Sequence, residues 1–336
     1  MPTGSSPQES ASQRPLTGWL ERLAARRQQA AEAEAQVQDA GTARVAVVTD
    51  SAAALPDTWV REAQTRGAFS VVPMPVMIDG DIFGEGVDDL HDQLCRALAA
   101  GRPVHTSRPS PGQFTRLYGE LAAAGFSGVV SIHISASLSG TTDAARLAAS
   151  SATIPITVVD SRTVGMAQGF GVQTALATAE AGGTMETVAA AARAAEECSV
   201  YFYVPSLEQL RRGGRIGAAA SWLGTVLSIK PILGIRDGLV VPVERVRSVP
   251  KAVGRLEELA LAAMEGRGTT ARWAVHHFGN QELAQELSIR LGLRSDVSNG
   301  GQLTALPAVL AAHTGLGALG VVIAGAGHDS SSTTGT

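Results

Sequence analysis

The stretch from Val129 to Ala149 carries hydroxyl side chains whose number and spacing could bind an anion. A short β-branched run at 129–134 is followed by Ser135, Ser137, Ser139, Thr141 and Thr142 around Gly140, and then by an alanine-rich helix. Hydroxyls beside the positive end of a helix suit a carboxylate, a phosphate or an acyl phosphate. Taken alone, the stretch is better explained as an ordinary capped turn between a strand and a helix.

Similar polar residues follow other predicted strands. Thr49-Asp50-Ser51 follow the run 45–48, Asp160-Ser161 follow 156–159, and Thr106-Ser107 lie in a proline-rich loop at 104–112. Strands that alternate with helices predict a doubly wound, mostly parallel sheet, whose strand ends meet at one edge. We therefore expect these hydroxyls to meet in a polar site, with Asp50 and Asp160 accepting loop N–H groups.

The pattern predicts an α/β protein of two domains. Helices are expected at 56–66, 87–100, 113–123, 169–181, 251–264 and 281–291. From Tyr201 the composition changes, and strands at 201–204 and 273–276 with a hairpin about Asp237-Gly238 predict a second, mixed α/β domain. We expect domains at 44–200 and 201–326, a flexible N-terminal extension at 1–43 and a disordered tail at 327–336.

Composition narrows the function class. The 336 residues are 45% hydrophobic and 17% charged with a formal net charge of -4, a globular balance that indicates no nucleic-acid partner. Cys95 and Cys198 show no metal or disulfide spacing, and no signal peptide is evident, so we expect a cytoplasmic protein. The uncharged run 303–326 contains Pro307, His313 and several glycines, which favours a helix, turn and strand over a membrane span.

With these segments placed, the chain resembles the DegV family, the fatty-acid-binding subunits of bacterial fatty acid kinase. The resemblance runs from about Arg44 to Ile323. It is carried in order by VVTDSAAALP, VVPMPVMIDG, HTSRPSPGQF, SIHISASLSGT, VVDSRTVGMAQG, LEQLRRGGRI, LSIKPIL, DGLVVPVERVRS and AHTGLGALG.

The resemblance implies site residues and a ligand. A long-chain fatty acid would lie in an apolar tunnel, its carboxylate held by Thr106, Ser107 and Ser139, with His313 in the same polar network. Arg215 and Arg247 match positions associated with docking to the kinase or with stabilising phosphoryl charge.

The chain departs from the family pattern at several positions. Arg108 stands where many members have glutamine, and its guanidinium could contact the head group directly. Ala136 or Ser137 stands where glycine is common, and Leu316 interrupts the last motif. These departures affect the expected acyl-chain preference rather than the fold.

The sequence favours a carrier over an enzyme. It has no GxxxxGK[ST] loop, and its only lysines, Lys230 and Lys251, lie in no kinase-like context. We expect no catalytic residue, metal or cofactor, and a separate ATP-dependent kinase subunit as partner, with transient contact to a membrane. The alternatives are a lipid sensor or transport protein without a kinase, and a serine hydrolase built from Ser139, His313 and Asp160, which lacks a GxSxG elbow.

Overall fold

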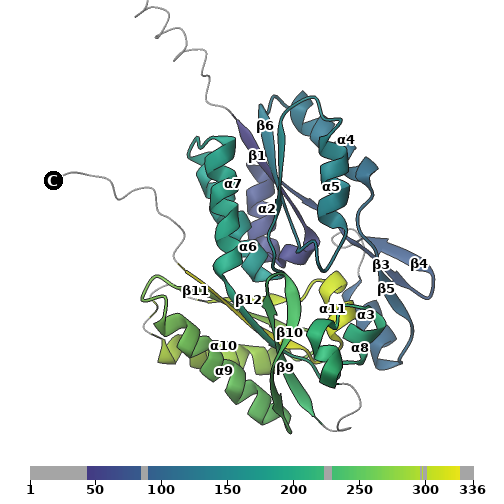
Figure 1. Cartoon of the computed structure of the whole chain (residues 1–336), viewed down its shortest axis with the longest axis vertical. Helices are drawn as coiled ribbons and strands as arrows, with labels where there is room; N and C mark the ends of the chain where they lie inside the picture. Colours follow the sequence, from purple (N-terminus) through teal and green to yellow (C-terminus); the bar gives the residue numbers. More distant parts are fainter. Residues whose placement is uncertain (1–43, 85–89, 223–228, 296, 298–300, 326–336) are drawn as a thin grey trace, which may run out of the picture. The chain divides into compact units, whose positions relative to one another are not determined.

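The computed structural model describes residues 44–84, 90–222, 229–295, 297 and 301–325. The expected extension at 1–43 and tail at 327–336 lie outside these residues. The described residues belong to one compact unit that begins at Arg44. Figure 1 shows its three sheets and the helices that pack on them.

A four-stranded parallel sheet forms the first half of this unit. Its strands are β1 (Val45–Asp50), β2 (Phe69–Val72), β6 (Gly128–His133) and β7 (Ile156–Asp160), in the order β2-β1-β6-β7. Every residue of β1 and β6 is buried, as expected for parallel strands covered on both faces. The predicted doubly wound sheet is confirmed.

Alternate side chains of these strands pack against helices on opposite faces. Val47 and Ile132 pack with α2 (Asp57–Thr65), α6 (Met166–Glu180) and α7 (Met185–Arg193). Val48 and Val129 face α4 (Pro111–Ala123) and α5 (Thr141–Ala149), which lie across the sheet from α6 and α7 (Figure 1). Because the strand order reverses direction between β1 and β6, this point of the carboxyl edge is where such folds bind ligands.

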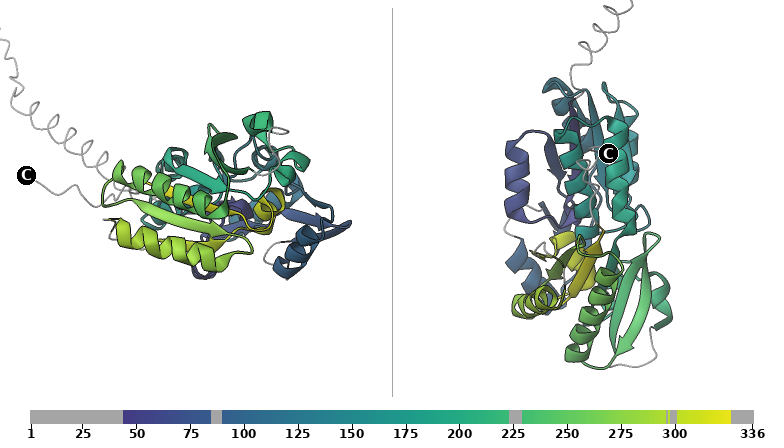
Figure 2. Two further views of the ribbon diagram at one scale, coloured as in Figure 1. Left: turned by 90° about the horizontal axis from the view of Figure 1, so that it is seen from below. Right: turned by 90° about the vertical axis from the view of Figure 1, so that its left-hand side faces the viewer.

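A mixed six-stranded sheet forms the second half, in the order β10-β9-β8-β13-β11-β12. Among these pairs only β11 and β12 run parallel. Helices α9 (Val249–Glu265) and α10 (Gln281–Arg294) lie side by side over one face of this sheet (Figure 2). The strands are β8 (Ser199–Tyr203), β9 (Lys230–Arg236), β10 (Leu239–Val246), β11 (Arg272–His277), β12 (Gln302–Ala305) and β13 (Leu319–Ala324).

A small antiparallel sheet connects the two halves. It contains β3 (Pro75–Ile78), β4 (Asp81–Gly84) and β5 (Val104–Thr106), and α3 (His91–Ala99) packs beside it. Helix α11 (Ala308–Thr314), from the end of the described chain, contacts β3, β5 and α3. The division into domains at 44–200 and 201–326 stays a prediction: the two large sheets follow it, whereas α11 packs against elements of the first half.

Several elements differ from those predicted. Residues 104–106 form β5 although the surrounding prolines suggested an irregular loop, because these three residues keep their N–H groups and pair with β3. Helix α7 and strand β12 were not predicted. The remaining short elements are α8 (Glu208–Arg212) and the 3-10 turns η1 (Ser51–Ala53), η2 (Ala194–Glu197) and η3 (Gly217–Trp222).

Candidate functional site

A cavity of about 400 Å³ lies among the three sheets, within the size range of small-molecule sites. Most of its lining is apolar. The apolar part comes from the cavity-facing side of the six-stranded sheet and from α11, and includes Val200, Phe202, Ile235, Val240, Val309, Leu310 and Val322. The polar residues come from strands, loops and α11, and they include every site residue predicted from the sequence except Arg247.

Six polar residues form what we call the rim cluster: Thr106, Ser107, Arg108, Ser139, Arg215 and His313. Direct contacts connect them. Thr106 bonds to His313, the Arg215 guanidinium donates to the carbonyl of Leu138 beside Ser139, and Arg108 donates to the carbonyl of Gly140. The sequence prediction that Thr106, Ser107, Ser139 and His313 share one cavity therefore agrees with the geometry.

His313 joins α11 to the small sheet. Its Nε2 lies 2.8 Å from Thr106 Oγ1 across 207 residues of sequence. The ring packs so closely on the C-terminal end of α8 that a Cβ at Gly213 would overlap it, so only glycine fits there. Burial, together with the nearby charge of Arg215, lowers the pKa of His313 to about 4. His313 is therefore neutral at pH 7.

Ser139 lies where α5 begins. Its Oγ is 2.9 Å from Thr141 Oγ1, and either hydroxyl can donate. The N-cap residue is Gly140, which has no side chain to cap the helix, so the first-turn N–H groups of α5 remain available at its positive end. Ser139 and the start of α5 together suit a carboxylate.

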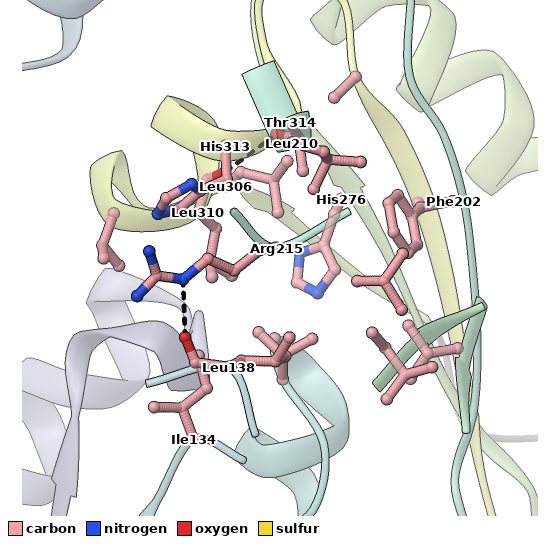
Figure 3. A pocket seen from close by; sticks show the side chains of 18 of the residues that line it. Ile134, Leu138, Phe202, Leu210, Arg215, His276, Leu306, Leu310, His313 and Thr314 are labelled. Atoms are coloured by element: carbon pink, nitrogen blue, oxygen red, sulfur yellow. Dashed lines mark hydrogen bonds between the residues drawn. The ribbon is translucent and has the colours of Figure 1, made fainter. Parts of the chain in front are cut away.

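The two arginines of the rim cluster are held differently. Arg215 donates from Nε to the Leu138 carbonyl at 3.0 Å and from Nη1 to the Gly213 carbonyl at 2.5 Å. Figure 3 shows the Arg215 side chain pointing toward Leu138. In the same view, His276 lies between Arg215 and Phe202. Arg108 is exposed and makes one long contact, 3.4 Å to the Gly140 carbonyl. Arg215 is thus held by backbone, whereas Arg108 is available to a ligand.

A second polar group, the inner cluster, lies beside the cavity but does not line it. Asp50 Oδ2 is 2.9 Å from His133 Nδ1, His133 Nε2 is 2.7 Å from Ser131 Oγ, and Tyr118 donates to Ser131 at 2.8 Å. All four side chains are buried, and burial raises the pKa of Tyr118 to about 12. His133 was not predicted as part of a polar cluster, because a lone histidine in an apolar strand gives no local signal of its partner.

The repeated hydroxyls after the strands do not all meet. Thr49 donates to the Ile132 carbonyl, Ser51 accepts from the N–H of Met74, and Ser161 donates to the Thr163 carbonyl. These hydroxyls satisfy backbone groups of neighbouring segments and do not line the 400 Å³ cavity. The expectation of one site containing all of them was wrong for these three.

The two carboxylates behave as expected. Asp50 accepts the N–H groups of Ala52 and Ile134, and Asp160 accepts those of Ala136 and Arg162. Both therefore bond to the segment at 134–140, which carries Ser139 of the rim cluster. The arrangement of Ser139, His313 and Asp160 that the alternative hydrolase would need does not form, because Ser139 pairs with Thr141 and His313 with Thr106.

Two further residues complete the comparison with the sequence. Arg247 is exposed, follows β10 and does not line the cavity. His276 lines the cavity and was not singled out. Its Nε2 accepts the N–H of Met166 at 2.9 Å, its Nδ1 lies 2.6 Å from Thr304 Oγ1, and burial lowers its pKa to about 4.

Comparison with known proteins identifies the family. Residues 44–326 match the family model described as uncharacterised protein, DegV family. A DegV domain-containing protein of Streptomyces coelicolor is 44% identical over 280 residues, which cover 83% of this chain and 98% of that protein. The chain belongs to the DegV family.

Solved DegV structures share the fold. A DegV family protein from Thermus thermophilus, described by its fatty acid binding, is 32% identical with a TM-score of 0.77 over 84% of this chain and 99% of its own. DegV from Bacillus subtilis, described as a fatty acid binding protein, is 29% identical with a TM-score of 0.73 over 84% and 99%. The expected family and its mixed α/β fold are confirmed.

Two further features of the described residues bear on metal binding and on membranes. No group of three or more His, Cys, Asp or Glu side chains among them could hold a metal ion. No described helix is both long and apolar enough to span a bilayer.

Proposed function

We propose that this DegV protein binds a long-chain fatty acid in the 400 Å³ cavity, with the carboxylate at the rim cluster and the tail along the six-stranded sheet. The observation that carries the proposal is the polarity of one cavity: connected donors at one end and apolar side chains over the rest. The fatty acids bound by the solved relatives from Thermus thermophilus and Bacillus subtilis support it.

The tail supplies most of the affinity. Each buried methylene is worth about 0.8 kcal/mol, so roughly fifteen methylenes contribute on the order of 12 kcal/mol before the costs of binding. A hydrogen bond from the rim contributes about 1–3 kcal/mol when the acceptor is charged. The rim cluster therefore sets the orientation of the acid group more than the affinity.

A carboxylate accepts hydrogen bonds only, so the rim must supply donors. If neutral His313 donates from Nε2 to Thr106 Oγ1, the Thr106 hydroxyl is free to donate to the ligand. Ser139 and Ser107 add hydroxyls, and Arg108 adds a guanidinium at the exposed side. Ser107 and Arg108 are exposed, which supports an acid group that a second protein can reach.

The direct test is the lipid content of the purified protein. Solvent extraction followed by mass spectrometry should recover about one fatty acid per chain. A delipidated sample should rebind a long-chain fatty acid and should bind the matching alcohol at least tenfold more weakly. Equal binding of the acid and the alcohol would contradict a carboxylate site at the rim.

We further propose that the bound acid is presented to a separate ATP-dependent kinase subunit, which converts it to the acyl phosphate. The protein would act in the cytoplasm without catalysing the transfer itself, and would contact membranes only transiently to load its ligand. Arg215 and Arg247 would guide docking or stabilise phosphoryl charge. Support comes from the exposed acid end and from the sequence, which contains no ATP-binding loop.

Kinase dependence is tested by measuring acyl phosphate formation with ATP, with and without the partner subunit. Arg247→Ala should leave fatty acid binding unchanged and slow the coupled reaction about tenfold, as for loss of a docking contact worth about 1.4 kcal/mol. Arg236→Ala removes an equally exposed arginine from the neighbouring strand and is the control. Acyl phosphate formation by the chain alone would refute the carrier role. If no kinase forms acyl phosphate from the bound acid, the sensor or transport alternative is favoured.

A further inference from the structure

A row of three residues crosses the six-stranded sheet on the side that faces the cavity. Phe202 of β8 pairs with Gly320 of β13, and Gly320 pairs with His276 of β11. All three line the cavity. Directly opposed residues on neighbouring strands point to the same face of a sheet. The rings of Phe202 and His276 therefore share one face, and Gly320 between them has no side chain there.

Nothing in the local backbone requires glycine at this position. Gly320 is not among the residues with positive φ, so an L-residue could adopt its conformation. A Cβ added there would lie 3.4 Å from Phe202 Cβ and 3.6 Å from His276 Cβ, which are ordinary contacts. Glycine inside a strand is unfavourable for stability. What glycine provides here is open space in the cavity.

The neighbours of Gly320 along β13 extend this space into a channel. Ala318 and Val322 share its face, because side chains alternate along a strand. The three positions span about 14 Å at roughly 3.4 Å per residue. The residues that form the floor of the channel therefore have small side chains or none at Ala318 and Gly320 and a larger side chain at Val322.

His276 lets an apolar chain pass although it is a polar residue. Both ring nitrogens are occupied, Nε2 by the N–H of Met166 and Nδ1 by Thr304. The ring thus needs no hydrogen bond from a ligand and can offer its carbon atoms to the channel. Figure 3 shows His276 in the middle of the labelled side chains, with Phe202 to one side.

We infer that Gly320 determines acyl-chain specificity: the gap it leaves between Phe202 and His276 admits the distal part of the tail and sets the longest chain that fits. This inference rests on the proposed fatty acid binding. A side chain at position 320 narrows the channel and selects shorter chains, whereas a smaller residue at position 202 widens it and selects longer ones.

The test is a competition among saturated fatty acids of 12 to 20 carbons for the delipidated full-length protein, read by mass spectrometry of the bound fraction. Relative to wild type, Gly320→Val should lower the bound ratio of 18- to 14-carbon acid at least tenfold, since each methylene that no longer fits costs about fourfold. Gly320→Ala should move the ratio in the same direction by less, and Phe202→Leu should raise it. Gly254→Val, which adds the same side chain to α9 where no atom lies within 4 Å, should leave it unchanged.

The outcomes separate this inference from the function on which it rests. A wild-type protein that binds no fatty acid refutes the proposed function. If the wild-type protein binds fatty acids and both Gly320→Ala and Phe202→Leu keep its chain-length profile, the specificity role is refuted while the proposed function stands. Those two mild variants keep the test decisive if Gly320→Val does not fold.

Discussion

The inner cluster and the rim cluster both contain a histidine beside hydroxyl groups, but they differ in how completely their polar groups are paired. In the inner cluster, Asp50, His133, Ser131 and Tyr118 are fully buried and each is bonded to the next. In the rim cluster, Ser107 and Arg108 are exposed, and Ser139 and His313 border a cavity. A histidine beside hydroxyls therefore does not by itself indicate a binding site.

The difference follows from the cost of burying polar groups. A buried donor or acceptor without a partner costs about 1–3 kcal/mol, so the inner cluster is stable only because it is fully paired. A fully paired cluster has no group left for a ligand. The rim cluster keeps unused donors because the cavity and solvent lie beside them. We expect mutations in the inner cluster to affect folding and those in the rim cluster to affect binding.

Removing Asp50 should give the largest effect. Asp50→Ala leaves His133 Nδ1 and the N–H groups of Ala52 and Ile134 unpaired inside the protein, so the free energy of unfolding should fall by about 3–5 kcal/mol. Urea unfolding measures this loss. Asp143→Ala, which removes an exposed carboxylate from α5, should change stability by less than about 0.5 kcal/mol. A loss below 1 kcal/mol for Asp50→Ala would contradict the structural role of the inner cluster.

The next largest effect should be a loss of stability in acid, caused by two buried histidines. His276 and His313 have pKa values near 4 in the folded protein, against about 6.5 when unfolded, so the unfolded chain takes up protons first. Stability is then complete above pH 6.5 and falls as the pH drops toward 4, by about 2 kcal/mol for each histidine at pH 5.

Urea midpoints at pH 7 and pH 5 test this prediction. His313→Gln should reduce the pH dependence. A bound carboxylate should also reduce it, because a negative charge beside His313 raises the pKa of that side chain. An identical pH dependence in wild type and His313→Gln would show that His313 is not held neutral.

A matched pair of threonines sharpens the comparison further. Thr106→Val removes a rim hydroxyl, so fatty acid affinity should fall about tenfold, or about 1.4 kcal/mol, with little change in the preferred chain length. Thr49→Val removes a hydroxyl that donates to the Ile132 carbonyl and accepts from Gln168, so stability should fall by about 1–2 kcal/mol while affinity is unchanged. Fluorescence titration and urea unfolding of both variants give the two values, and equal effects on binding would remove the distinction between a paired, buried hydroxyl and a hydroxyl of the rim cluster.

Arg108 should give the smallest effect. Arg108→Gln replaces an exposed guanidinium with an uncharged amide, so affinity should fall two- to fivefold at low salt. Because salt screens an exposed charge, the difference from wild type should shrink at 0.5 M sodium chloride. A difference that does not depend on salt would mean that Arg108 acts by shape rather than by charge.

Local signals predicted much of the fold. Ser110 and Pro111 mark the start of α4, where Ser110 and Gln113 form a capping box. Asp237-Gly238 forms the tight turn between β9 and β10, with positive φ at both residues. Helix α7 was also locally predictable, since Thr184 caps it by accepting the N–H of Thr187. Strand β5 was not, because only its pairing with β3 makes those three residues a strand.

The site was predicted in part. The residues Thr106, Ser107, Ser139 and His313 came from the family resemblance, and the structure brings them to one cavity. Arg247 lies outside the cavity lining, and its docking role stays a prediction. His276 and Gly320 were overlooked, because a glycine or histidine in a strand gains meaning only from the residues on the adjacent strands.

The sequence by itself determined where strands end, which loops carry hydroxyls, and which carboxylates hold those loops. Only the tertiary structure decided which hydroxyls face a ligand. Thr49 and Thr106 both lie at strand ends, yet one bonds to the carbonyl of a neighbouring strand and the other to a histidine 207 residues away at the cavity. The reason is that burial and pairing depend on segments distant in sequence, and these determine whether a polar group is already satisfied or free to bind.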